Sequence, residues 1–323
     1  MEGTSPVIVA DGLQRAFTVG RGQRKETIEA VRHLDLEVRA GERLAFIGPN
    51  GAGKSTSIKM LTGILHPTGG HALVLGLVPW HERRTLSRRI GTLFGQRSLL
   101  WSELAAVETY RMLGAIYGLG HAHVTRRLDE LGELLDAASL FHQPVRTLSL
   151  GQRMRCELAA CLLHEPSLVF LDEPTIGLDL LAKQRFRELL VTLNTELGTT
   201  VFLTSHDVAD IEYVADRAVI VNDGRVIRDA SVAALRAELL TNKRVRVGLA
   251  GVDPAVVAAA LTGPGRATTP TSTGIDLAVD TDVCTIETAL TAVFAAAPGA
   301  VVDVAIDDAP LEDVIASIYR SPT

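Results

Sequence analysis

Residues 48–56 read Gly48-Pro49-Asn50-Gly51-Ala52-Gly53-Lys54-Ser55-Thr56. They fill the pattern of a glycine, four free positions and then Gly-Lys-Ser, which is typical of phosphate-binding loops. The glycines allow backbone conformations in which successive N–H groups curl round an anion. In such loops the lysine reaches the β- and γ-phosphates and the serine hydroxyl ligates Mg²⁺. We therefore predict that Lys54 binds phosphate and that Ser55 binds the metal ion.

The sequence on either side of this loop supports the prediction. Before it, Leu44-Ala45-Phe46-Ile47 is an apolar run of strand length, and after it residues 57–61 start a helical pattern. The N-terminus of that helix favours a bound phosphate. The sequence thus predicts a nucleoside triphosphate site, with loop contacts from Gly48, Asn50, Gly51, Gly53, Lys54, Ser55 and Thr56.

Composition restricts the class of protein. The chain has 323 residues, of which 47% are apolar and 22% charged, as in a soluble globular protein large enough for two domains. A net charge of −6 argues against a general nucleic-acid coat, so no nucleic-acid partner is expected. The three scattered cysteines fit core thiols better than a disulfide framework or a zinc site. No signal peptide or membrane span is expected.

The apolar patterns predict an α/β fold in two parts. Continuous apolar runs at 168–171 and 200–203 indicate strands buried on both faces, as in a mainly parallel sheet. Leu34, Leu36 and Val38 alternate with acidic residues and predict a strand of an antiparallel N-terminal β subdomain. Helical spacing predicts a helical insertion over about 98–155. We expect an ATP-binding domain over 1–240 and a small α+β domain over 241–323, which becomes ferredoxin-like if 266–269 supplies a strand.

Two carboxylates follow the apolar run 168–171. At the carboxyl end of a central strand, Asp172 would lie beside the phosphate loop and hold Mg²⁺ through water. Glu173 would face an attacking water as the general base, a role that contributes about 10²–10⁴-fold in rate. An isolated Asp-Glu pair is more often solvated, but the phosphate loop upstream favours the catalytic interpretation.

Further motifs resemble those of one family, the ATP-binding-cassette (ABC) ATPases. Leu148-Ser149-Leu150-Gly151-Gln152 resembles their signature loop, and Gly177-Leu178-Asp179 resembles their D-loop. Gln96 resembles the glutamine of their Q-loop, and His206 resembles their switch histidine. The motifs stand in family order, and the resemblance covers about 7–235. Leu150 replaces the commonest glycine, a variant that resembles a branch of exporter ATPases.

The resemblance implies a shared site and a set of roles. In this family two cassettes pair head to tail, with ATP between the phosphate loop of one and the signature of the other. Catalysis would use Glu173, His206 and Gln96, and the metal would be held by Ser55, Gln96 and Asp172. The partner's ATP would contact Ser149, Gly151, Gln152 and Asp179. By the same resemblance Phe17 would stack on adenine, although such a phenylalanine is more often part of a core.

The function implied by the resemblance is an ATPase subunit of an ABC transporter. We expect it to hydrolyse ATP with Mg²⁺ at the cytoplasmic face of the membrane, paired with a second copy or a paralogous ATPase. It would dock on separately encoded polytopic membrane subunits and power solute movement, with export as the expected direction. The alternatives are an ABC ATPase acting on ribosomes or DNA, and a regulatory ATPase with a protein partner. Trp101 would either face a membrane partner or pack in the helical insertion.

Overall fold

The computed structural model describes residues 5–19, 26–94, 98–240, 242–308, 315 and 318–319. The chain divides into two compact units, Met1–Ala230 and Ser231–Thr323. The second unit thus begins ten residues before the expected domain boundary at 240/241. Among the described residues no helix is both long and apolar enough to cross a membrane.

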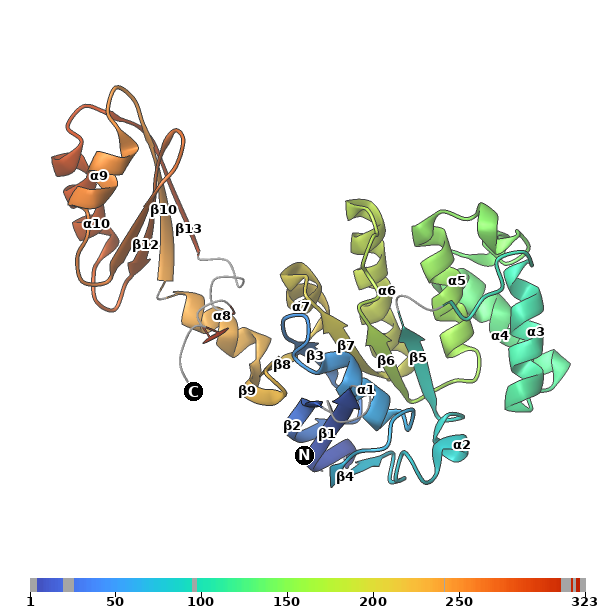
Figure 1. Ribbon diagram of the computed structural model, residues 1–323. Coiled ribbons are helices and arrows are strands. Elements are labelled where there is room, and N and C mark those ends of the chain that lie inside the picture. Colours follow the sequence, from blue (N-terminus) through green and yellow to red (C-terminus); the bar gives the residue numbers. More distant parts are fainter. Residues whose placement is uncertain are drawn as a thin grey trace. The chain divides into compact units, whose positions relative to one another are not determined.

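A nine-stranded mixed sheet organises the described part of the first unit (Figure 1), with strand order β4-β1-β2-β9-β8-β3-β7-β6-β5. Strands β8, β3, β7, β6 and β5 form its parallel half. These strands span Arg217–Asn222, Arg43–Ile47, Thr200–Ser205, Leu168–Asp172 and Ile90–Phe94. The predicted α/β class with a mainly parallel core is confirmed.

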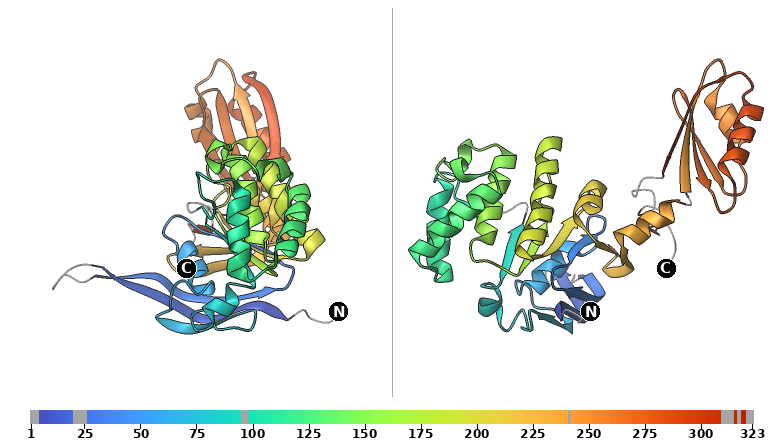
Figure 2. Two further views of the ribbon diagram at one scale, coloured as in Figure 1. Left: turned by 90° about the vertical axis from the view of Figure 1, so that its right-hand side faces the viewer. Right: turned by 180° about the vertical axis from the view of Figure 1, so that it is seen from behind.

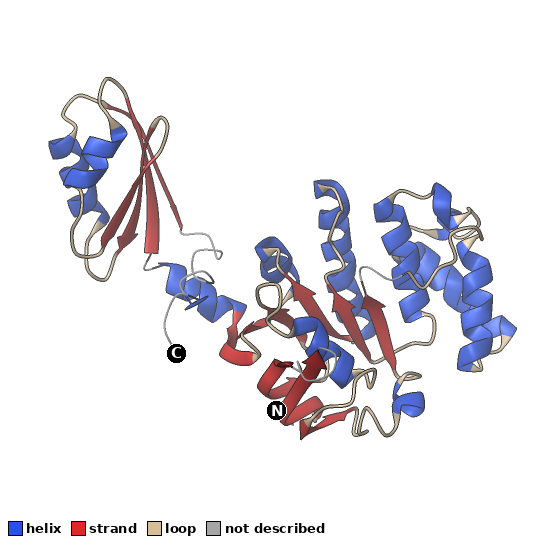
Figure 3. Cartoon of the chain, in the orientation of Figure 1, coloured by secondary structure: helices blue, strands red, loops and turns tan. Residues whose placement is uncertain are grey.

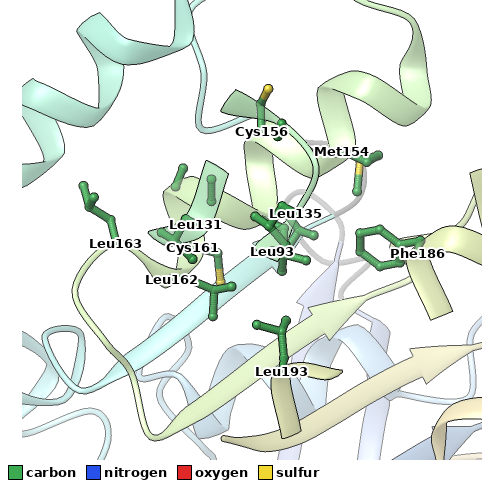
Figure 4. Close-up of a cluster of buried hydrophobic side chains, with 14 of the residues drawn as sticks. Leu93, Leu131, Leu135, Met154, Cys156, Cys161, Leu162, Leu163, Phe186 and Leu193 are labelled. Atoms are coloured by element: carbon green, nitrogen blue, oxygen red, sulfur yellow. The ribbon is translucent and has the colours of Figure 1, made fainter. Parts of the chain in front are cut away.

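Both faces of the parallel half are buried, because alternate residues enter two different cores. On β6, Val169 and Leu171 join one apolar cluster while Leu168 and Phe170 join the other. The first cluster contains side chains of α5 (Leu150–Leu162) and α6 (Leu180–Leu197), and the second contains those of α1 (Lys54–Leu61). Figure 4 shows Leu93 of β5, Phe186 and Leu193 of α6 and Leu135 within the first cluster. Helices therefore cover both faces, which explains the continuous apolar runs.

The N-terminal strands form the predicted antiparallel part. β1 (Pro6–Val19) pairs antiparallel with β2 (Glu26–Arg39) and with β4 (Gly69–Val74). Figure 2 shows the long pair β1 and β2 side by side in blue. β9 (Arg225–Ser231) joins β2 to the parallel half through one parallel bridge, His33 to Arg225.

The predicted helical insertion is also present. It contains α3 (Ala106–Tyr117) and α4 (His121–Leu134), the short 3₁₀ turns Ala138–Leu140 and Val145–Thr147, and then α5. Where this unit is described, its remaining helices are α2 (Arg83–Leu86) and α7 (Val208–Val214). Cys156 and Cys161 of α5 and Cys284 of the second unit are buried free thiols, as expected.

The second unit has its own antiparallel sheet and core. After α8 (Val232–Leu240), the order is β10 (Asn242–Leu249), α9 (Pro254–Ala260), β11 (Arg266–Pro270), β12 (Gly274–Asp280), α10 (Ile286–Ala296) and β13 (Val301–Asp308). The strand order β11-β12-β10-β13 and the βαββαβ sequence are ferredoxin-like. Figure 3 shows both helices on one side of this sheet. The sequence also predicts a short amphipathic helix over 311–319, which falls largely outside the described residues.

Candidate active site

The phosphate loop connects β3 to α1 through glycines that no other residue could replace without strain. Gly53 adopts φ 102°, and a Cβ built there would lie 2.4 Å from the carbonyl oxygen of Ala30. A Cβ on Gly48 would lie 2.5 Å from the carbonyl oxygen of Val221. The loop is therefore packed directly against neighbouring backbone, which holds its N–H groups in place at the start of α1.

Lys54 lies at the centre of the loop and is almost fully buried. Its Nζ donates to the carbonyl oxygen of Gly48 at 2.6 Å and lies 3.6 Å from Oε1 of Glu173. The ammonium group thus lies between the loop and the carboxylate predicted to be the base. This position fits the predicted role, in which the ammonium group would supply positive charge to a bound phosphate chain.

A cavity of about 810 Å³ opens beside this lysine. That volume lies in the range of small-molecule sites. Its walls bring together loop residues, both predicted carboxylates and the predicted switch histidine. They comprise Ala30, Pro49, Asn50, Gly51, Gly53, Lys54, Ser55, Thr56, Lys59, Ile64, Phe94, Asp172, Glu173, Ile176 and His206.

Side-chain oxygen atoms of Asp172, Ser55 and Thr204 lie close together where β6 ends beside α1. Oδ1 of Asp172 accepts hydrogen bonds from Ser55 Oγ at 3.2 Å and from Thr204 Oγ1 at 2.7 Å. Mg²⁺ prefers oxygen ligands and is held by one or two protein groups together with substrate phosphates. The donor set at Ser55 and Asp172 fits that ion.

The predicted base and the switch histidine form a hydrogen-bonded pair. Nδ1 of His206 donates to Oε2 of Glu173 at 2.7 Å, and the backbone N–H of His206 points to the same oxygen at 3.3 Å. Glu173 has φ 53°, a left-handed conformation that is strained for a side chain with a Cβ. Its N–H donates to both the carbonyl oxygen and Oγ1 of Thr204, at 3.1 and 3.0 Å. These bonds hold the strained residue beside the carboxyl end of β7.

Comparison with known proteins identifies the family. A sequence profile of the ABC transporter family matches residues 31–176. The ABC transporter ATP-binding protein NatA of Bacillus subtilis (strain 168) is 30% identical over 212 residues, which cover 66% of this chain and 86% of NatA. The chain belongs to the ATP-binding subunits of ABC transporters.

Two further ABC proteins extend the comparison. The daunorubicin resistance ATP-binding protein DrrA3 of Streptomyces coeruleorubidus is 36% identical over 231 residues, covering 72% of this chain and 70% of DrrA3. Among solved structures, the dimeric post-hydrolysis state of the ATP-binding cassette MJ0796 bound to ADP and Pi is similar, with a TM-score of 0.61 and 25% identity. That match covers 70% of this chain and 98% of the cassette. The ABC assignment thus rests on sequence and fold together.

The ABC signature loop lies outside the cavity of its own chain. Ser149 caps α5: its Oγ accepts from the N–H of Gln152 at 3.3 Å, while Oε1 of Gln152 accepts from the N–H of Ser149 at 2.9 Å. This reciprocal capping fixes the start of the helix. Ser149 is exposed and Gly151 is half-buried. A Cβ on Gly151 would lie 2.9 Å from that of Ala182 on α6.

The D-loop aspartate also caps a helix. Asp179 is exposed, and its Oδ1 accepts from the N–H of Ala182 at 2.8 Å at the start of α6. A Cβ built on Gly177 would lie 3.2 Å from Cδ2 of Leu150, the departure from the commonest signature. The signature and the D-loop of this ABC subunit are therefore close neighbours within one chain.

Phe17 lies on β1, opposite Ile28 of β2, and is half-buried. The guanidinium carbon of Arg15 stands 4.6 Å from the centre of its ring, in cation–π range. Phe17 is not among the residues that line the cavity. Its contact with adenine stays a prediction, and an adenine would have to take the ring face that Arg15 does not cover.

Gln96 lies outside the described residues. Sequence reasoning missed Thr204, which joins Asp172 to Glu173, and the cavity residues Ala30 and Ile176. For Thr204 a signal existed, because it ends an apolar strand directly before Ser205 and His206. Trp101 is about half exposed.

Proposed function

We propose that this chain is the ATP-hydrolysing subunit of an ABC exporter. It would dock at the cytoplasmic face of the membrane on separately encoded polytopic subunits. The main support for ATP hydrolysis is the hydrogen bond of 2.7 Å between His206 Nδ1 and Glu173 Oε2. Both residues line the same cavity as Lys54. Export is supported by the relatives named for drug resistance, which include DrrA3.

The residues divide the chemistry among them. Glu173 accepts a proton from the attacking water, and His206 orients the Glu173 carboxylate through Nδ1. Lys54 neutralises charge on the β- and γ-phosphates. Ser55 and Asp172 would hold Mg²⁺, with Gln96 as the further expected ligand, and the ion would neutralise phosphate charge.

The signature loop would act on a second copy of the chain. Ser149 and Asp179 are exposed and stand apart from the cavity lining, so neither serves the cavity of its own subunit. A head-to-tail pair would bring Ser149, Gly151 and Gln152 of one subunit onto the ATP held by the other. The start of α5 would then offer its N–H groups to the γ-phosphate.

A mixed-dimer experiment tests this arrangement. One protein carries Lys54→Ala and the other carries Ser149→Arg, whose bulk blocks closure. Each homodimer has two damaged sites and should retain less than about a tenth of the ATPase activity, because binding or closure is lost. A mixed dimer has one site with both lesions and one intact site. Mixing should therefore restore part of the activity once crosslinking shows that mixed dimers form.

Two results would contradict the proposal. If the crosslinked mixed dimer binds no ATP at its intact site, the shared-site arrangement is wrong. If the chain purifies from membranes without a polytopic protein and instead with ribosomes or DNA, the transporter role is wrong. The control for the mixture is a pair of Lys54→Ala proteins with distinguishable tags, which should stay inactive.

A further inference from the structure

A buried carboxylate lies behind the catalytic pair. Asp210, on α7, has no solvent exposure. Its Oδ2 accepts from Thr175 Oγ1 at 2.5 Å and from Ser205 Oγ at 2.8 Å, and its Oδ1 accepts from Arg187 Nε at 2.6 Å. The Asp210 carboxylate therefore forms hydrogen bonds to three separate segments of the chain: the loop after β6, the end of β7 and helix α6.

Arg187 connects Asp210 to a second carboxylate. Its Nη2 lies 3.3 Å from Oδ2 of Asp207, which also receives Lys183 Nζ at 2.5 Å. Burial raises the pKa of Asp207, but Lys183 and Arg187 outweigh it and hold the pKa below its ordinary value. Asp207 is thus charged at neutral pH. Its other oxygen, Oδ1, accepts from the N–H of Ala209 at the start of α7.

The bonded residues flank the catalytic ones. Thr175 comes two positions after Glu173, while Ser205 and Asp207 stand on either side of His206. The network therefore holds the loops of Glu173 and His206 at residues next to the carboxylate and the imidazole that form the catalytic pair. A buried ion pair is weak grounds for inferring stability, because desolvation offsets its attraction. The position of this ion pair between the two loops indicates that it fixes where the loops lie relative to each other.

We propose that Asp210 and Arg187 are positioning residues that keep the Glu173 carboxylate and the His206 imidazole within hydrogen-bonding distance of each other. The inference rests on the proposed function, since it assigns both groups to ATP hydrolysis. Asp210 and Arg187 touch neither ATP nor water in this scheme. They act through the loops that Thr175 and Ser205 belong to.

The test measures kcat and KM for MgATP in the full-length chain carrying Asp210→Asn or Arg187→Gln. Misplacing a catalytic group by about 1 Å costs as much as 10²-fold. We expect kcat to fall by about 10–100-fold while KM changes by less than about threefold. Asp229→Asn is the control, because Asp229 is also held by an arginine, Arg217 at 2.6 Å, in the hairpin β8–β9. It should retain the kcat of the unmodified protein.

Milder variants cover the case in which Asp210→Asn fails to fold. Thr175→Val and Ser205→Ala each remove one hydroxyl bond to Asp210, and each should lower kcat without changing KM. Combining Ser205→Ala with His206→Ala should lower kcat no further than His206→Ala alone, because Ser205 acts through the histidine loop. A merely structural role would give additive losses instead.

The outcomes separate this inference from the proposed function. An unmodified chain with no ATPase activity alone, in the dimer or with its partner overturns both. An active chain whose folded Asp210→Asn and Ser205→Ala variants keep kcat within about twofold overturns only the positioning role, since that role requires a kcat loss. Additive losses with His206→Ala also overturn it.

Discussion

At the residue scale, the site depends on one strained glutamate. Glu173 has φ 53°, and the two bonds from its N–H to Thr204 over-determine that conformation. Strain of this kind costs about 1–3 kcal/mol and persists where the surroundings enforce it. The carboxylate is thereby presented to His206 Nδ1 and, 3.6 Å away, to Lys54 Nζ.

Glu173→Gln should therefore keep ATP binding and lose turnover. The amide has the same shape but accepts no proton, so kcat should fall by about 10²–10⁴-fold. The variant should move to the dimer position on a sizing column in ATP and Mg²⁺, because closure is no longer followed by hydrolysis. Glu165→Gln is the control, since Glu165 also has a positive φ, 55°, and does not line the cavity. Hydrolysis at the parental rate by the Glu173→Gln protein would show that another group is the base.

At the scale of elements, His164 joins the helical insertion to the sheet. It follows α5, stacks on Tyr117 of α3 with ring centres 4.0 Å apart, and its Nε2 donates to the carbonyl oxygen of Ile90 on β5 at 2.9 Å. Nδ1 is buried and has no hydrogen-bond partner among the described residues. Burial lowers the pKa of His164, against the bond to Ile90 that raises it. The folded state thus prefers the neutral ring.

Stability should consequently fall as pH falls below about 6.5, the ordinary histidine value. Above that pH the ring is neutral in both states, and below it the unfolded chain binds the extra proton first. The contribution is lost as pH falls towards the lowered pKa of the folded state, by at most about 1.4 kcal/mol per pH unit. His164→Phe keeps an aromatic ring against Tyr117 and cannot titrate. Urea unfolding at pH 8 and pH 5.5 should show a smaller pH effect in His164→Phe, and an equal effect in both proteins would refute the assignment.

At the scale of the whole molecule, nucleotide binding belongs to the first unit. All cavity-lining residues fall between Ala30 and His206. The second unit has a separate apolar core that includes Val245, Leu277 and Val293. We predict that residues 1–240 suffice for ATP binding and that 241–323 form an accessory part, a boundary that follows α8 and leaves that helix of the second unit in the shorter chain.

A chain ending at residue 240 should bind MgATP with a Kd within about threefold of the full-length value, because no contact to the phosphates is removed. Equilibrium binding of a fluorescent ATP analogue measures this, and circular dichroism verifies that the truncated chain is folded. Lys54→Ala in the same truncated chain is the negative control. A folded truncated protein that binds no ATP would show that the accessory part completes the site.

The sequence by itself determined the features that neighbouring residues encode. The phosphate loop, the acidic pair after β6 and the strands β3, β6 and β7 could all be predicted in this way. Their signals are fixed spacings and apolar runs, which act over a few residues. Even β11 was foreseen conditionally, within the segment 266–269.

Only the tertiary structure decided which distant polar residues meet. Arg187 and Asp210 are 23 positions apart and read as ordinary charged residues of two helices, yet α6 and α7 bring them together in the interior. Thr204 and Asp172 meet because β6 and β7 are parallel neighbours, which places their ends at one edge of the sheet. The physical reason is that a buried carboxylate needs hydrogen-bond partners, and these come from segments that only the fold brings together. The partners of a turn or a helix cap lie a few residues away in the sequence.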